Sequence, residues 1–208
     1  MAAFCPECQL RYNCICEYLP SIEINAHIAL LMHENELTRD TNTGQWLLKS
    51  TQTTSQHIWQ RKRPCSRLMA LITHPNYQPL LLFPEKHSQL INNAIWLSQS
   101  QGKKPLFIII DGTWQEARKI VRKSPWLNDI PKVHIKTSRP SSYQLRRNQE
   151  LGNLCTLEVG AEIIQALGDK SSAEKLRLFL GHYCQAFHAD KSGHQFDSKS
   201  AKRRKEAG

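Results

Sequence analysis

The chain has 208 residues, of which 40% are hydrophobic, so it can bury one substantial core and carry at most a small appended module. Its 28 Lys and Arg residues against 18 Asp and Glu give a formal net charge of +10, which favours a polyanionic partner, nucleic acid first. The first residues lack the apolar stretch of a signal peptide, and no segment approaches the ~20 apolar residues of a membrane helix. We therefore expect a cytoplasmic protein.

Four of the seven cysteines fall within the first sixteen residues. They are spaced C-x2-C-x5-C-x-C, and this short loop offers four soft ligands to one tetrahedral Zn²⁺: Cys5, Cys8, Cys14 and Cys16. Four thiolates leave no open coordination position, so we expect a structural zinc site within residues 1–20. The alternative is four unligated thiols, which would leave this segment almost without a core.

Beyond a boundary near Pro20, apolar runs alternate with stretches of helical spacing up to about residue 190. We expect strands at residues 22–32, 66–73, 79–83, 105–110 and 132–136. We expect helices at residues 88–97, 114–123, 154–167 and 172–188. Residues 33–44 and 137–153 are polar loops, and residues 45–63 are ambiguous. The chain thus divides into a zinc-binding segment at 1–20, a main domain at 21–190 and a basic, disordered tail at 191–208.

The turn that follows residues 105–110 is the candidate active site. The alternation of strands and helices predicts an α/β domain with a mostly parallel sheet, and such sheets bind ligands beyond the carboxyl ends of their strands. Asp111 stands at such an end and could act as a base or an anchor. Thr113 precedes Glu116 by three residues, the spacing of a helix capping box. Alternatively, Asp111 only caps the helix and Trp114 is a core aromatic.

Several segments of the chain resemble the DTW-domain family. The D-x-T-W motif that names this family stands here as Asp111, Gly112, Thr113 and Trp114. The likeness includes the cysteine cluster and the segments LLMHENELTRDTNTG (30–44), LLFPE (81–85), DGTWQEARKI (111–120) and SYQLRRNQELGNLCTLE (142–158). Together they cover nearly the whole chain up to about residue 190; DGTWQEARK and TRDTNTG are the specific ones, whereas LLFPE alone would mean little.

The resemblance implies an enzyme that modifies tRNA. The bacterial members that this chain resembles are tRNA-uridine aminocarboxypropyltransferases. They move the 3-amino-3-carboxypropyl group of S-adenosylmethionine to the imide nitrogen of a uridine, here expected in the tRNA variable loop, and release 5′-methylthioadenosine. The resemblance also implies kinship with the SPOUT class, whose carboxy-terminal segment forms a trefoil knot around the cofactor.

The resemblance further assigns roles to individual residues. For the reaction so implied, Asp111 is the candidate general base, because the weakly acidic imide nitrogen becomes a good nucleophile after it loses its proton; the carboxylate would deprotonate or orient the uridine ring. For the S-adenosylmethionine site the resemblance implies Thr41, Thr43, Thr113, Trp114, Leu154, Cys155, Thr156 and Glu158. Some of these have plainer alternatives: an ordinary polar turn at residues 41–44, a helix cap at Thr113, and an arginine partner for Glu158.

Basic residues could form the surface that binds tRNA. Four cations share one side of the helix at 114–123: Arg118, Lys119, Arg122 and Lys123. Further candidates are Arg39, residues 61–63, Arg139, Arg146, Arg147 and the tail at 202–205. The plainer alternative for each cluster is a solvated surface.

Two other functions are compatible with the sequence. The first is an S-adenosylmethionine-dependent RNA methyltransferase, which would release adenosylhomocysteine. The second is a non-catalytic, zinc-bearing RNA-binding factor, whose binding would not respond to S-adenosylmethionine. Neither the tRNA species, nor the uridine position, nor the oligomeric state follows from the sequence.

Overall fold

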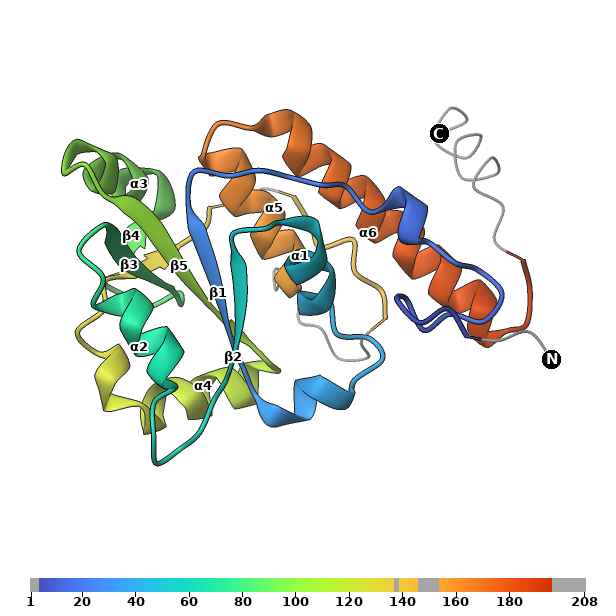
Figure 1. Ribbon diagram of the computed structural model, residues 1–208, viewed down its shortest axis with the longest axis horizontal. Helices are drawn as coiled ribbons and strands as arrows, with labels where there is room; N and C mark the ends of the chain where they lie inside the picture. The colour runs from blue at the N-terminus through green and yellow to red at the C-terminus, as the bar shows by residue number, and fades with distance from the viewer. Residues whose placement is uncertain (1–3, 137–138, 146–153, 196–208) are drawn as a thin grey trace.

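The computed structural model describes residues 4–136, 139–145 and 154–195, which form an α/β fold around one parallel sheet (Figure 1). Within these residues the sheet has six strands in the order β2-β1-β5-β3-β6-β4, and every neighbouring pair is parallel. The strands are β1 (His27–Met32), β2 (Thr54–Ile58), β3 (Tyr77–Leu82), β4 (Gln89–Leu90), β5 (Lys104–Asp111) and β6 (Lys132–His134). The α-helices are α1 (Gly44–Ser50), α2 (Ser66–Ile72), α3 (Ile91–Ser100), α4 (Trp114–Lys123), α5 (Thr156–Ala166) and α6 (Lys170–Lys191). The expected α/β class with a mostly parallel sheet is confirmed.

Strand β5 lies at the centre of the sheet because its side chains are apolar on both faces. Phe107 and Ile109 face one hydrophobic core, whereas Leu106 and Ile108 face another. Helices α1, α3, α5 and α6 cover the first face, and α2 and α4 cover the second (Figure 1). A strand buried on both sides has no polar face, which explains its continuous apolar sequence.

The expectation of a strand at residues 66–73 is wrong, because this segment forms helix α2. Leu68, Leu71 and Ile72 stand at i, i+3 and i+4 and pack together against the sheet. A short apolar run fits both a strand and a buried helix, so its period alone does not separate them. The ambiguous stretch at 45–63 contains most of α1 and the edge strand β2. The sequence of β2, TSQHI, is too polar to predict a strand.

The amino-terminal cysteine segment packs along helix α6 (Figure 1). Cys8, Leu10 and Ile15 belong to the same hydrophobic core as α5 and α6. The carboxylate of Asp190 on α6 accepts hydrogen bonds from the backbone N–H groups of residues 11, 12 and 13, at 2.6 to 3.0 Å. The segment is therefore joined to the sheet domain by a shared core and by a carboxylate.

The carboxy-terminal features expected from the resemblance lie partly outside the described residues. Helix α6 continues to Lys191, and most of the tail expected to be disordered lies at 196–208, beyond the described part. The trefoil knot stays a prediction. Among the described residues, the helices are too short or too polar to traverse a lipid bilayer.

Candidate active site

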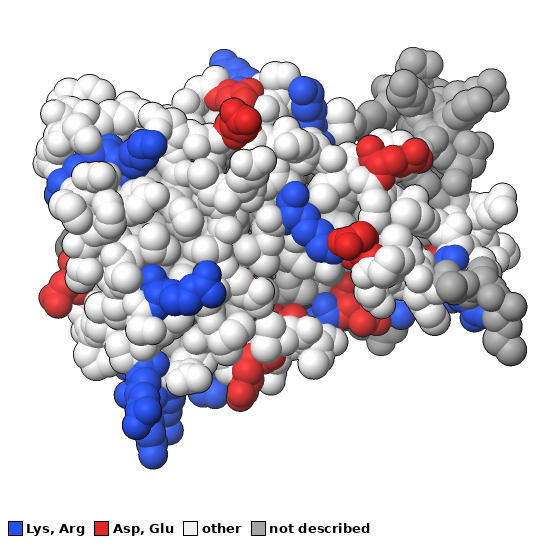
Figure 2. Space-filling model, viewed as in Figure 1, with Lys and Arg blue, Asp and Glu red and all other residues white. Residues whose placement is uncertain are grey.

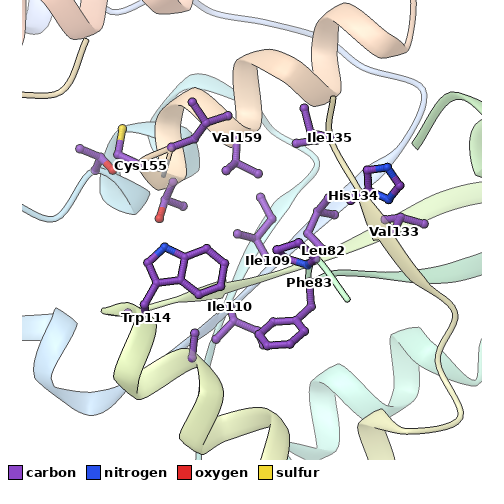
Figure 3. A pocket seen from close by; sticks show the side chains of 16 residues that line it. Leu82, Phe83, Ile109, Ile110, Trp114, Val133, His134, Ile135, Cys155 and Val159 are labelled. Carbon is purple, nitrogen blue, oxygen red and sulfur yellow. The ribbon is translucent and has the colours of Figure 1, made fainter. Parts of the chain in front are cut away.

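A pocket of about 190 Å³ lies beyond the carboxyl ends of β3, β5 and β6 (Figure 3). Its walls are mainly apolar and include Leu82, Ile109 and Val133 from these three strands. Trp114, the first residue of α4, lies on one side, and Cys155 and Val159 lie on the opposite side (Figure 3). The pocket stands at the strand ends, where parallel α/β sheets place their ligands.

Two aromatic rings border the pocket. The ring centroids of Phe83 and Trp114 are 6.2 Å apart, and the rings are tilted by 53°. Trp114 is 36% exposed, so part of the indole is open to a ligand. An indole face attracts a cation, and its N–H can donate a hydrogen bond. The alternative of a purely core aromatic does not agree with this position.

The start of α5 forms the opposite wall through residues 154, 155 and 156. The thiol of Cys155 accepts a hydrogen bond from the backbone of Glu158, and the Glu158 carboxylate accepts one from the Cys155 N–H at 2.8 Å. Burial raises the pKa of the Cys155 thiol, which keeps it neutral. Thr43 joins this wall and accepts a hydrogen bond from the Leu157 N–H at 3.4 Å.

The residues expected to bind the cofactor divide into two groups. Those that line the pocket are Thr43, Trp114, Leu154, Cys155 and Thr156. Thr41, Thr113 and Glu158 are absent from its lining. The Thr41 carbonyl accepts a hydrogen bond from the Tyr143 hydroxyl at 2.6 Å, and Thr113 caps helix α4. The Glu158 carboxylate accepts hydrogen bonds from Ser141 and Ser142 at 2.7 Å, which fastens residues 141–142 to α5.

Asp111 is buried directly behind the pocket wall, with only 2% of its surface exposed. One carboxylate oxygen accepts a hydrogen bond from the Asn42 amide at 2.8 Å, and the other accepts one from the Thr156 hydroxyl at 2.5 Å. A Cβ atom on Gly44 would stand 2.5 Å from the first of these oxygens. Only glycine therefore lets α1 begin so close to this carboxylate.

A chain of polar side chains runs from Asp111 to the start of α4. The Asn42 amide also donates to Glu36 at 2.7 Å, and Glu36 pairs with Arg39. The Arg39 guanidinium reaches both oxygens of Glu116 at 3.0 Å. Arg39 thus forms ion pairs with Glu36 and Glu116, whereas from the sequence we expected it to contact RNA.

Glu116 completes this network at the N-terminus of α4. Its carboxylate accepts from the Thr113 N–H at 2.8 Å, while its own N–H donates to the Thr113 hydroxyl, the reciprocal pattern of a capping box. Burial acts to raise the pKa of Glu116, but the hydrogen bonds from Arg39, Thr113 and Asn35 outweigh it and lower the pKa to about 2. This carboxylate is therefore ionised at neutral pH.

Sequence reasoning missed the network residues Glu36 and Asn42 and the pocket residues Phe83 and His134. Glu36 and Asn42 belong to the segment LLMHENELTRDTNTG, and Phe83 to LLFPE, so a signal for these three existed. A polar residue that binds another polar residue far along the chain has no periodic pattern. Its role becomes visible only when the fold brings both partners together.

The four amino-terminal cysteine thiols form one cluster, with all sulfur atoms within 4.8 Å of one another. The Cys5 sulfur lies 3.8 Å from that of Cys16 and 3.6 Å from that of Cys14. Thiolates bound to one Zn²⁺ at about 2.3 Å in a tetrahedron have sulfurs about 3.8 Å apart. The cluster is therefore compatible with a metal site.

The basic residues expected to bind RNA fall into three groups. Arg118 and Arg122 are exposed on α4. Arg139 donates to Glu174 at 3.1 Å, and Arg39 belongs to the network beside the pocket. Arg146 lies outside the described residues. The structure thus leaves α4 as the clearest cationic surface among these candidates.

The parallel α/β fold and the pocket at its strand ends describe a domain with a candidate ligand site, to which a segment with a cysteine cluster compatible with a metal site is attached. The chain belongs to the DTW-domain family, whose family model matches residues 2–188. No solved structure matches it.

The chain is also similar to three animal proteins, each named tRNA-uridine aminocarboxypropyltransferase 2. It is 26% identical to the Drosophila melanogaster protein over 193 residues, which cover 89% of this chain and 74% of that protein. It is 25% identical to the Macaca fascicularis protein and 27% identical to the Mus musculus protein; each alignment covers 78% of this chain and 56% of the relative. The likeness to bacterial members stays a prediction.

Proposed function

We propose that this protein transfers the 3-amino-3-carboxypropyl group of S-adenosylmethionine to the imide nitrogen of a uridine in tRNA and releases 5′-methylthioadenosine. The family membership and the names of the three relatives support this function. The structural observation that carries it is the convergence of three distant segments on one pocket. These are Thr43, Trp114 and residues 154–156.

Two features of the pocket support S-adenosylmethionine as its ligand. Its apolar walls suit an adenine ring, and residues 154–156 at the start of α5 line the pocket. The exposed part of Trp114 can meet the positive sulfonium. When bound, S-adenosylmethionine supplies an electrophilic carbon beside its sulfonium. The pocket's task is to hold that carbon in line with the nucleophile, because orientation decides which group moves.

Asp111 has the geometry of a positioning residue. A general base must come within hydrogen-bond reach of the proton that it removes. Asp111 is buried and absent from the pocket lining, and it holds Thr156, which does line the pocket. Asp111 then holds Asn42, which precedes Thr43, and Thr156 in fixed positions, and the uridine loses its proton to another group.

The cysteine cluster fits Zn²⁺ as a structural ion. Cys5, Cys8, Cys14 and Cys16 would fill its four coordination positions, so the ion would take no part in the transfer. We place the protein in the cytoplasm, where its tRNA substrate and a reducing environment for free thiols occur together.

The test is mass spectrometry of nucleosides from tRNA incubated with the purified protein and S-adenosylmethionine. The tRNA comes from a strain that lacks this protein, so that its target uridine is unmodified. Expected products are aminocarboxypropyl-uridine and methylthioadenosine in equal amounts, and sequencing of the modified tRNA identifies the position, expected in the variable loop. Adenosylhomocysteine would indicate a methyltransferase instead. Tight tRNA binding without any modified nucleoside would indicate a non-catalytic RNA-binding factor.

A further inference from the structure

Among the residues that the structure describes, seven exposed Lys and Arg side chains without an ion pair gather on one surface, which we name the basic ridge. It consists of the loop after β2 and the outer side of α4, namely Arg61, Lys62, Arg63, Arg118, Lys119, Arg122 and Lys123. All seven side chains are exposed. Figure 2 shows Lys and Arg side chains projecting at the lower edge of the molecule, where this loop runs in Figure 1.

The two parts of the ridge are neighbours in space although they are far apart in the sequence. The Lys119 ammonium lies 5.8 Å from the ring centroid of Trp59, just before the loop. The Trp59 indole N–H donates to the Ser124 hydroxyl at the end of α4, at 2.8 Å. Trp59 is buried and belongs to the core beneath α4. The buried Trp59 therefore holds the loop and the helix next to each other, and both expose their cations.

The charge of the ridge is not neutralised from within the described part of the chain. None of its seven cations forms an ion pair there, whereas Arg39 and Arg139 do. Glu116 is the one acidic residue of α4, and its carboxylate is turned towards Arg39. Seven cations gathered without counter-charges repel one another, so the ridge is suited to an external polyanion.

The ridge also has a direction, because its helix begins at the pocket. Trp114 borders the pocket, and Arg118 and Arg122 follow it at i+4 and i+8, which places all three along one stripe of the helix. Successive members of this stripe are about 6 Å apart along the axis. A polyanionic chain bound along Arg118 and Arg122 would therefore reach the exposed part of Trp114.

We propose that the basic ridge holds the phosphate backbone of the tRNA and guides the target uridine into the pocket past Trp114. This inference rests on the proposed function, since it takes tRNA as the polyanion. It assigns binding to the ridge and leaves Arg39 and Arg139 to the intramolecular ion pairs that they form with glutamates.

The test compares two double variants that remove the same number of charges. Arg118→Ala with Arg122→Ala removes two cations of the stripe. Lys103→Ala with Lys104→Ala removes two cations where β5 begins. This amino end of the strand is opposite to the carboxyl end at which the pocket lies. Binding of unmodified bulk tRNA is measured for both and for the wild type over a range of salt concentrations. Circular dichroism and the affinity for S-adenosylmethionine verify that both variants keep their fold and pocket.

The ridge variant is expected to bind tRNA about tenfold more weakly or worse, with a salt slope that is shallower by about one unit per lost phosphate contact. The Lys103/Lys104 variant is expected to bind as the wild type does. Equal affinities for all three proteins, or an equal loss in both variants, would overturn the ridge as the binding surface. Failure of the wild type to produce aminocarboxypropyl-uridine would instead refute the proposed function, and the binding comparison would still decide the ridge.

Discussion

Asp111 accepts hydrogen bonds from two residues that the sequence separates widely, Asn42 before α1 and Thr156 at the start of α5. One carboxylate thereby connects the segment before α1 to the start of α5, and both segments contribute residues to the same wall of the pocket. It can do so because it follows the central strand β5, which the two hydrophobic cores hold in place. At this position a buried carboxyl group is satisfied by hydrogen bonds that also set the shape of the site.

The role of Asp111 can be separated into positioning and proton abstraction by the variant Asp111→Asn. Positioning predicts that the KM for S-adenosylmethionine rises more than kcat falls, because the amide accepts one hydrogen bond fewer and loosens Thr156. The control Asn42→Ala removes the other hydrogen bond that Asp111 accepts and leaves the carboxylate itself in place, so it should likewise affect KM more than kcat. A fall in kcat of about 10²-fold or more, confined to Asp111→Asn and with KM unchanged, would support a general base. Initial rates over donor concentration and pH provide both parameters.

The acid side of the stability profile should depend on Glu116. Its pKa of about 2 lies below the ordinary value of 4.5, so its ionised form stabilises the fold above pH 4.5, and this contribution is lost as pH falls towards 2. Glu116→Gln should lower the free energy of unfolding at neutral pH by about 1–3 kcal/mol and flatten its decline below pH 4.5. Urea unfolding at several pH values measures this. Glu174→Gln removes an exposed partner of Arg139 and should change little; an equal effect in both would contradict the prediction.

At the scale of elements, the sequence predicted best where local and global preferences agree. The capping box of Thr113 and Glu116 marked the start of α4, and the helix runs from Trp114 to Lys123 as expected. The expectation of a strand at residues 66–73 was wrong because a short apolar run fits a buried helix as well as a strand. The start of α1 was missed, since the reason for Gly44 lies in Asp111, which is distant in the sequence.

Helix α1 should tolerate no side chain at its first position. Gly44→Ala would bring a Cβ atom to 2.5 Å from the Asp111 carboxylate, so either the helix or the carboxylate must move. We expect a lower melting temperature and weaker binding of S-adenosylmethionine, measured by thermal denaturation and calorimetry. Gly181→Ala on α6 is the matched control, because a Cβ atom there meets no atom within 4 Å. It should be neutral or stabilising by about 0.5–1 kcal/mol. Indistinguishable melting temperatures would show that α1 has room to adjust.

At the scale of the whole molecule, the cysteine segment is part of the structure that supports α6. Cys8, Leu10 and Ile15 lie in the main core, and Asp190 receives three backbone N–H groups between Cys8 and Cys14. Burial opposes the ionisation of Asp190, yet these donors lower its pKa. Loss of the metal should therefore destabilise more than the first twenty residues.

Removal of the metal with a chelator is expected to lower the melting temperature of the whole chain by several degrees, since about 1 kcal/mol corresponds to about 2–4 °C in a protein of this size. Asp190→Ala should weaken metal retention about 10–100-fold, because it removes support behind the ligand loop. Atomic emission measures the metal, and far-ultraviolet circular dichroism measures melting. A chelated protein that melts at the original temperature would show that the segment and the sheet domain are independent.

From the sequence alone one could derive the parallel α/β class, the strand that ends at Asp111, the helix that follows it and the cysteine cluster. Each of these depends on residues close together in the chain, where hydrophobic periodicity, helix-capping residues and the spacing of metal ligands can be recognised. Tertiary structure decided which candidates share a pocket, which of the arginines are already paired, and that Asp111 is buried. These outcomes depend on contacts between distant segments, and such contacts form only when strands and helices pack into one core.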